Sequence, residues 1–389
     1  MSATLLRDLQ AAAAALDFDL TGVVPSAPEV GTELSQFGLW IESGFGGEMQ
    51  YLRAKNEAGA YKRESLRDAL PWSRSAIVCA INYNTAPPYS TEQPKSEDGS
   101  ARGWISRYAW SAMAGADSTG AGGNSAEMRA TDYHQTVLAR LRKLEAWLVE
   151  NAPAHGITEP IQSRCYVDTG PIVERFHAKY AGLGWIAKNT CLINQRLGSW
   201  IFLCVIVTSL PAEAFLGETA PLPPPDRCGS CTRCIEACPT QAFVAPYRMD
   251  ASRCIAYLTI EKRGSIPEEL REGIGRNVFG CDICQDVCPW NRKAPATSLP
   301  EFQPRPELVN PELQKLAMMT REEFRSTFRG SPVERTKYSG FRRNVAIAMG
   351  NSQDPSLLPA LEEMARDEDA YLAEHARWAI EKLKLASKK

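Results

Sequence analysis

The sequence predicts a mixed α/β protein, of the α+β or α/β class, built from three successive regions. Residues 1–220 alternate strand-like apolar runs with segments of helical spacing, which is typical of a layered domain. Eight of the twelve cysteines fall between Cys228 and Cys288, whereas residues 301–389 contain none. The stretch from Pro221 to Pro225 is a stiff, proline-rich linker. We therefore expect domains at 1–220, 221–300 and 301–389.

Length and composition limit the class of protein. With 389 residues, 44% hydrophobic and 23% charged, the chain is typical of a globular protein of two or three domains. No apolar run approaches the roughly 18–20 residues that span a bilayer. The N-terminus lacks the apolar core of a signal peptide, so we expect a cytoplasmic protein with no membrane partner. The net charge of −2 excludes nucleic-acid binding by bulk charge but leaves room for a local basic patch.

The first region is expected to form a sheet with helices packed on it. Apolar side chains at helical spacing predict helices, and continuous apolar runs predict buried strands. The expected helices span Leu5 to Leu16 and Thr131 to Glu150; the expected strands are Leu20 to Val24, Ser75 to Tyr83, a segment at Val167, and Trp200 to Val207. Between Ala112 and Ala130 the chain is rich in Gly, Ala and Ser, which predicts a loop.

The cysteines of the second region are spaced for iron–sulfur clusters. The first run, Cys228-x2-Cys231-x2-Cys234-x3-Cys238-Pro, is that of bacterial two-cluster ferredoxins, and four further cysteines complete eight thiolates. The fourth cysteine of such a run binds the other cluster. We therefore assign two [4Fe–4S] clusters to crossed sets: Cys228, Cys231, Cys234 and Cys288 for one, and Cys238, Cys254, Cys281 and Cys284 for the other. A pair of zinc sites is the weaker interpretation, because zinc sites commonly use paired CxxC halves.

The third region is expected to consist of short amphipathic helices. Helical spacing covers Gly340 to Gly350, Ser356 to Arg366 and Ala370 to Leu385, which suggests a HEAT-like unit that must pack on the preceding region. From Arg325 to Arg343 there are six basic residues and one glutamate. Such a run is either a solvated face or a surface for nucleic-acid phosphates, and the sequence leaves both interpretations open.

Two aspartates are candidates for proton chemistry. Asp168 follows the apolar Val167 and precedes a Thr-Gly-Pro turn, where an enclosed carboxyl would have a raised pKa and could act as a general acid. The alternative is that Asp168 only orders the turn. Asp132 begins an Asp-Tyr-His segment and either lies near the site or is the N-cap of the helix that starts there. His134 is expected to be a capping or packing residue.

Several segments together resemble the tRNA epoxyqueuosine reductases. They are VDTGPIVERFHAKYAGLGWIAKN from Val167, CGSCTRCIEACPTQAF, RCIAYLTIEKRGSIPEELR and GCDICQDVCPWNR, and the resemblance extends over nearly the whole chain. It implies a cobalamin-dependent enzyme with two [4Fe–4S] clusters that reduces the epoxide of epoxyqueuosine in tRNA to the alkene of queuosine. It also implies a nitroreductase-like cobalamin-binding domain, a ferredoxin-like domain, and a HEAT-like helical region that helps to hold the anticodon stem–loop.

The resemblance implies roles for individual residues. Asp168 matches the family's catalytic aspartate, which gives a proton to the epoxide oxygen and contacts the cofactor, and Asp132 matches a second acidic position near the site. The other expected cobalamin contacts are Ser106, Arg107, Lys188, Asn189, Ala256 and Tyr257. The expected tRNA contacts are Lys262, Arg263, Arg292, Lys293, Arg335, Lys337, Arg342 and Arg343. None of the four histidines lies in a D-x-H-x-x-G corrin motif, which agrees with a family that binds cobalamin without a histidine ligand.

The chain departs from the family pattern in two places, and two other functions compete with this one. About twenty residues, Ser111 to Ala130, are inserted near the expected active-site mouth, and Ala256 stands where the family commonly has serine. A corrinoid reductase of the dehalogenase type would act on a small molecule and would not need the basic C-terminal region. A non-enzymatic two-cluster electron carrier would not need the first 220 residues. We expect a monomer that receives electrons from an unidentified low-potential donor.

Overall fold

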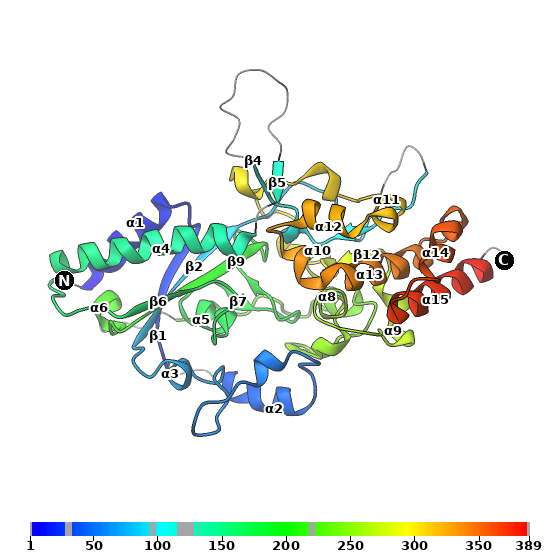
Figure 1. Ribbon diagram of the computed structural model, residues 1–389. Coiled ribbons are helices and arrows are strands. Elements are labelled where there is room, and N and C mark those ends of the chain that lie inside the picture. Colours follow the sequence, from blue (N-terminus) through cyan, green and yellow to red (C-terminus); the bar gives the residue numbers. More distant parts are fainter. Residues whose placement is uncertain are drawn as a thin grey trace, which may run out of the picture.

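A four-stranded antiparallel sheet forms the centre of the first region in the computed structural model (Figure 1). The structure describes residues 2–27, 33–92, 94, 99–114, 128–130, 132–217 and 222–386. The strand order is β1-β2-β9-β6, with β1 (Leu20–Pro25), β2 (Ser75–Asn82), β6 (Ser163–Tyr166) and β9 (Ile201–Thr208). Every pairing in this sheet is antiparallel, so the arrangement is α+β and has no parallel βαβ unit here.

The two faces of the sheet bury different helices. Alternate residues of β2 point to opposite faces: Ile77, Cys79 and Ile81 pack with α1 (Ser2–Ala15) and α4 (Tyr133–Asn151). Ala76, Val78 and Ala80 pack with α5 (Glu174–Tyr180). Because both faces are covered, β2 is buried along its whole length, which explains its continuous apolar sequence. The two expected helices and the expected strands at Leu20, Ser75 and Trp200 are confirmed within three residues at their ends, whereas Val167 lies just beyond the end of β6.

Shorter elements surround the sheet. They are α2 (Phe37–Glu42), α3 (Leu66–Ala69), α6 (Glu213–Leu216), β7 (Trp185–Ile186) and β8 (Leu192–Ile193). The segment from Ala112 to Ala130 was expected to be a loop, but its two ends are short strands. Strand β4 (Ala112–Ala114) pairs antiparallel with β5 (Met128–Ala130). Residues 115–127 of that insertion lie outside the described residues.

The cysteine-rich region consists of short helices and strands joined by turns. Its elements are α7 (Arg233–Glu236), β10 (Phe243–Ala245), β11 (Arg248–Met249), α8 (Ile255–Ile260), α9 (Glu268–Ile274), β12 (Asn277–Phe279) and α10 (Ile283–Asp286). Strand β12 pairs in parallel with β3 (Trp104–Ile105), which belongs to the first region by sequence. The predicted boundary at residue 220 therefore does not separate two independent cores.

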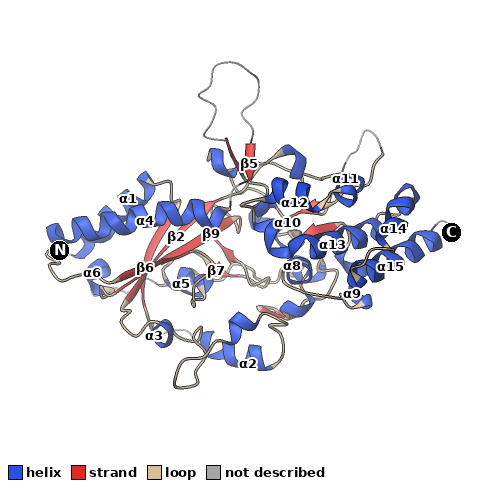
Figure 2. Ribbon diagram, in the orientation of Figure 1, coloured by secondary structure: helices blue, strands red, loops and turns tan. Residues whose placement is uncertain are grey.

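The C-terminal region is helical, as expected. It contains α11 (Leu313–Met318), α12 (Arg321–Phe328), α13 (Lys337–Asn351), α14 (Leu358–Met364) and α15 (Ala370–Ala386). Its core residues, among them Phe341 and Val345, share one cluster with Trp104 of β3 and Phe279 of β12. Figure 2 shows the main sheet at one end of the molecule and these helices at the other. No helix among the described residues has the length and apolar character needed to cross a membrane.

Candidate active site

Asp168 lies on a tight turn between β6 and α5. Val167 is buried, and the Asp168 backbone has a φ of 56°, in the left-handed region that few non-glycine residues adopt. The next residue turns back at once, because the Thr169 N–H donates to the Val167 carbonyl at 2.6 Å. The Asp168 side chain is 64% exposed. The carboxylate is therefore presented at the end of the sheet and is not enclosed in the protein core.

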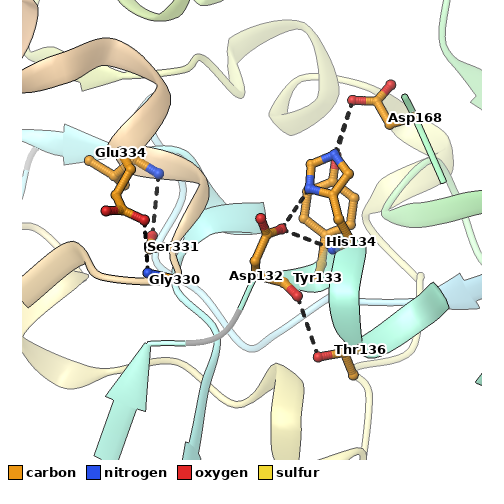
Figure 3. Close-up of polar contacts among 9 residues, drawn as sticks. Asp132, Tyr133, His134, Thr136, Asp168, Gly330, Ser331 and Glu334 are labelled. Atoms are coloured by element: carbon orange, nitrogen blue, oxygen red, sulfur yellow. Dashed lines mark hydrogen bonds and ion pairs between the residues drawn. The ribbon is translucent and has the colours of Figure 1, made fainter. Parts of the chain in front are cut away.

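The segment that opens α4 meets this carboxylate (Figure 3). Asp132 is the N-cap, since its side chain accepts the His134 backbone N–H at 2.9 Å. The same oxygen lies 2.6 Å from His134 Nδ1, while His134 Nε2 lies 3.5 Å from Asp168 Oδ2. The Tyr133 hydroxyl donates to that Asp168 oxygen at 3.2 Å. Asp132 therefore caps the helix and also orients His134 toward Asp168.

His134 is more than the capping or packing residue expected from the sequence. It links two carboxylates that are 36 positions apart in the chain. The available signal was the spacing of Asp132 and His134 at a helix start, where a capping aspartate can reach the side chain two residues later. The partner across the site, Asp168, could not be inferred from that spacing.

The charges in this group decide which side chain holds a proton. Burial by itself would lower the pKa of His134, but the hydrogen bonds to Asp132 and Asp168 outweigh it and raise the pKa to about 9. The hydrogen bond from His134, together with its charge, in turn lowers the pKa of Asp168. At neutral pH the imidazole is cationic and Asp168 is ionised. The raised pKa expected for Asp168 from its sequence context is therefore wrong for this arrangement.

A further carboxyl, that of Glu174, adjoins the same turn. Glu174 Oε1 accepts the Asp168 backbone N–H at 2.7 Å. Burial, and after it the negative charge of Asp168, raise the pKa of Glu174 to about 8. Glu174 is therefore protonated at neutral pH, so Asp168 has a proton-bearing group on each side. No motif in the sequence marks Glu174 for this position.

A groove of about 410 Å³ opens beside the Asp168 turn, lined by Glu48, Met49, Gln50, Tyr51, Glu261, Arg263, Arg335 and Lys337. Arg63 connects the groove to the turn, because its guanidinium donates to the backbone carbonyls of Tyr51 and Gly170, each at 2.9 Å. Arg335 stacks over the Tyr51 ring, 5.6 Å from its centroid, and its charge helps to lower the pKa of Asp168. One cation of the groove, Arg335, therefore acts on the Asp168 carboxylate.

The clustered cysteines interact in two sets. Burial raises the pKa of Cys234, and the thiols of Cys228 and Cys231 add to that effect. Burial and the thiols of Cys254 and Cys238 likewise raise the pKa of Cys281. These neighbours are those of the crossed assignment, and bound iron would offset the repulsion that arises once the thiols ionise to thiolates. Among the described residues no three potential ligands lie close enough for a single metal ion; a [4Fe–4S] cluster is larger and needs its thiolates farther apart.

Two protein-family models match segments of this chain. A family model described as "Epoxyqueuosine reductase QueG, DUF1730" matches residues 63–169, and one described as "4Fe-4S double cluster binding domain" matches residues 227–291. The epoxyqueuosine reductase of Pseudomonas aeruginosa is 36% identical over 371 residues, which cover 94% of this chain and 91% of that protein. The chain belongs to the epoxyqueuosine reductase family. The Escherichia coli K12 relative is 34% identical and covers 88% of this chain and 80% of its own length.

Solved structures of epoxyqueuosine reductases have the same fold. One, crystallised with an epoxyqueuosine-modified tRNA-Tyr stem loop, is 28% identical with a TM-score of 0.79, covering 99% of this chain and 94% of that one. The Bacillus subtilis structure, in which the catalytic aspartate loop is swung out of the active site, is 27% identical with a TM-score of 0.78, over 99% and 94% of the two chains. The expected family is thereby confirmed, and so are the mixed α/β fold and the double-cluster domain.

Three residues expected to contact cobalamin have buried side chains. Ser106 and Arg107 are each 2% exposed. Ser106 Oγ donates to Asp282 at 2.6 Å, and the Arg107 guanidinium donates to backbone carbonyls of residues 85–88. Tyr257 is 6% exposed, and its hydroxyl accepts the Glu48 N–H at 2.8 Å. These side chains join segments of the protein, so the expectation that they line an open cofactor site is corrected.

The remaining expected cofactor contacts lie where the first region meets the cysteine-rich region. Lys188 Nζ donates to the backbone carbonyl of Cys231 at 3.1 Å, and Asn189 Nδ2 donates to that of Cys284 at 3.3 Å. Ala256 is half-buried near the start of α8. Lys188 and Asn189 therefore contact the backbone of two cysteine loops, one from each predicted cluster.

The basic residues expected to contact tRNA differ in exposure. The expectation is wrong for Arg343, which is 2% exposed. Its guanidinium donates to the carbonyls of Leu258, Lys262 and Gly264 at 2.7–3.0 Å, and burial lowers its pKa to about 10. Buried in this way, Arg343 joins α13 to the end of α8 and cannot reach a phosphate.

Three further cations of this set are held in ion pairs. Arg342 pairs with Asp367, and Lys262 pairs with Glu48; both of these side chains are half-buried. Arg335 pairs with Glu261 at 2.5 Å and remains exposed. The exposed members of the set are Arg263, Arg292, Lys293, Arg335 and Lys337. The basic stretch near the start of α13 is thus partly packed and partly accessible.

Proposed function

We propose that this chain reduces the epoxide of epoxyqueuosine in tRNA to the alkene of queuosine. The observation that carries the proposal is the contact of Asp132, His134 and Asp168 beside a cation-lined groove, in a chain of the epoxyqueuosine reductase family. The reaction consumes two electrons and two protons and releases water. The two [4Fe–4S] clusters deliver electrons one at a time, and the side chains around Asp168 supply the protons.

Asp168 is the proposed proton donor to the epoxide oxygen. Because it is ionised beside His134, it must first take up a proton. The His134 cation provides one along the existing contact, from Nε2 to Asp168 Oδ2, and the aspartic acid then gives this proton to the oxygen. His134 then regains a proton from solvent, and a second transfer by the same path completes the water. The arrangement keeps a proton source next to Asp168 while the exposed carboxylate faces the substrate side.

Cobalamin is the proposed further cofactor, and the histidines fit a corrin bound without an imidazole ligand. Both nitrogens of His134 face carboxylates, and His177 is 1% exposed. His155 lies against Thr4 and Asp8, and both nitrogens of His375 contact backbone atoms. When bound, cobalt would supply the low-valent nucleophile or one-electron reductant that side chains lack. The chain's proposed contacts to it are Asp168, Lys188, Asn189 and Ala256.

The tRNA stem–loop is proposed to lie over the groove. The exposed cations Arg263, Arg335 and Lys337 line it, and cations of this kind bind phosphates with release of counterions. Arg292 and Lys293 are proposed further contacts. We also propose the finer architecture of the family: a nitroreductase-like cobalamin domain, a ferredoxin-like domain, and a HEAT-like helical region. The proposed enzyme is a cytoplasmic monomer that receives electrons from a low-potential donor.

Two alternatives account for less of the molecule. A dehalogenase-type reductase of small molecules does not need exposed cations around the acid site, and a two-cluster electron carrier does not need the acid site. The test is to reconstitute the protein anaerobically with iron, sulfide and cobalamin. We expect eight irons and one corrin per chain, and conversion of epoxyqueuosine to queuosine in tRNA measured by nucleoside analysis. A protein that binds no corrin, or leaves the epoxide intact with a strong reductant, overturns the proposal.

A further inference from the structure

We propose that Glu174 is a positioning residue for Asp168, which fixes the backbone of the Asp168 turn so that the carboxylate stays against His134. The inference rests on the proposed function for its catalytic meaning, but its structural content does not depend on the substrate. The contact in question is the hydrogen bond from the Asp168 backbone N–H to the Glu174 carboxyl, at 2.7 Å. Among the described residues it is the one hydrogen bond that joins α5 to this N–H.

The turn needs such a contact because its conformation is unfavourable. Asp168 has a left-handed φ of 56°, which costs a residue with a side chain of order 1–3 kcal/mol. Gly170 passes so close to Tyr166 that a Cβ added to it would lie 2.5 Å from the ring. A turn that is strained at one residue and tightly packed two residues later keeps its shape only when surrounding groups hold it.

Glu174 is well placed to hold the turn. It is the first residue of α5, and the helix beyond it is anchored by buried Phe176 and Ala178 against the sheet. Its carboxyl therefore projects from a rigid base. On the other side of the turn, Arg63 donates to the Gly170 carbonyl at 2.9 Å. Glu174 and Arg63 therefore hydrogen-bond to the backbone of the turn at Asp168 and at Gly170. His134 and Tyr133 contact the Asp168 side chain instead.

The charges around Glu174 allow this contact next to another carboxylate. Asp168 faces it with a negative charge, whereas His134, Arg175 and Arg63 face it as cations. With its raised pKa of about 8, Glu174 is uncharged at neutral pH and still accepts through its carbonyl oxygen. It therefore holds the Asp168 N–H without repelling the Asp168 carboxylate. A glutamine has the same shape, the same acceptor and no charge.

The experiment compares Glu174→Ala and Glu174→Gln with the reconstituted wild-type protein. The control is Glu145→Ala, which removes a glutamate that accepts Ser163 Oγ at 2.7 Å at the far end of β6. Hydrogen exchange followed by mass spectrometry reports on the amides of residues 168–170, and single-turnover assays report on reduction of epoxyqueuosine tRNA. We expect Glu174→Ala to exchange these amides roughly tenfold faster and to reduce turnover by roughly tenfold. Its affinity for tRNA should not change.

Rescue separates positioning from a general structural loss. Glu174→Gln is expected to retain wild-type exchange and turnover at pH 7, and Glu145→Ala should retain both as well. Unchanged exchange in Glu174→Ala overturns the proposal, and so does a Gln variant as impaired as the Ala variant. If the wild-type protein does not reduce epoxyqueuosine, the proposed function fails, yet the exchange measurement still decides whether Glu174 holds the turn.

Discussion

His134 lies between the carboxylates of Asp132 and Asp168, and this position explains how an exposed Asp168 keeps a defined orientation. One imidazole nitrogen is fixed by Asp132, which is itself held by its role as the helix N-cap. The other nitrogen faces Asp168. The negative charges on both sides keep the imidazole protonated at neutral pH. A residue that orients an acid and can also recharge it suits a reaction that uses two protons.

Replacing Asp168 by asparagine tests the proton donor. Asp168→Asn keeps the shape of the side chain but cannot donate a carboxyl proton, so we expect turnover to fall by roughly 10²-fold or more. Iron content, corrin content and tRNA affinity should be retained. Single-turnover nucleoside analysis is the measurement. Asp8→Asn is the matched control, because Asp8 faces His155 at the same 3.5 Å distance but far from the site; equal loss in both variants would contradict a specific role for Asp168.

Replacing His134 by glutamine tests its charge through the pH dependence of stability. The pKa of His134 is raised from its ordinary value of 6.5 to about 9. Its stabilising effect is therefore complete below about pH 6.5 and is lost as pH rises through 9. At pH 6 we expect the free energy of unfolding of the wild-type protein to exceed that of His134→Gln by roughly 1–2 kcal/mol. This range allows for solvent screening of the interaction with the exposed Asp168. Denaturant unfolding at pH 6 and pH 10 measures this; a difference independent of pH would show that the imidazole is not charged in the folded state.

At the scale of elements, α13 decides which cations of the basic stretch are accessible. This helix packs against α15 and β12 and presents Arg343 to the backbone of α8. Arg342, one position earlier, turns to Asp367 and the ring of Tyr338. Neighbouring positions on a helix point about 100° apart, so a run of cations cannot share one face. Because α13 is packed in this way, Arg342 and Arg343 form contacts within the protein and are not free to bind a phosphate.

Arg343→Met is expected to destabilise the protein without affecting recognition of tRNA. The variant leaves three buried carbonyls without a donor, for which we expect a loss of roughly 2–4 kcal/mol. Denaturant unfolding measures the loss. The salt dependence of tRNA binding should be unchanged. Arg325→Ala, an exposed residue of α12, is the control and should alter stability by less than about 0.5 kcal/mol. A stable Arg343→Met protein with a flatter salt dependence would reverse this assignment.

At the scale of the whole molecule, the groove combines three distant parts of the chain. Residues 48–51 come from the first region, Glu261 and Arg263 follow α8, Arg335 precedes α13, and Lys337 is the first residue of that helix. The turn that carries Asp168 joins them through Arg63. Each region therefore contributes one wall, and the acid lies at the edge of a basic surface. A folded nucleic acid that meets this surface would contact all three regions at once.

Removing the groove cations should weaken tRNA binding in a salt-dependent way. For Arg335→Ala with Lys337→Ala we expect the slope of log affinity against log salt to decrease by about 2, or about 1 per contact. Fluorescence anisotropy with an anticodon stem–loop between low and moderate salt measures the slope. Arg142→Ala, an exposed cation of α4, is the control. An unchanged slope in the double variant would assign these charges to a solvated face.

Local signals in the sequence were sufficient for several features. The continuous apolar run of β2 predicted a strand because burial on both faces leaves no polar position. The cysteine spacing predicted a double-cluster domain, which the family model over residues 227–291 confirms, while the crossed ligand sets stay a prediction. Ser106, Arg107 and Tyr257 were placed wrongly because a motif shows that a residue type recurs, not which way its side chain points. In the fold their side chains form hydrogen bonds to residues in other segments of the chain.

The sequence by itself determined the classes of element, the double-cluster domain and the family, since each depends on residues close together in the chain or on a recurring motif. Only the tertiary structure decided the site. The packing of α4 on the sheet brings His134 to Asp168, the start of α5 places Glu174 under the same turn, and the seating of α13 on α8 buries Arg343. Such contacts depend on the relative placement of whole elements, which arises from the burial of their apolar faces and is not encoded in the spacing of the charged residues that they bring together.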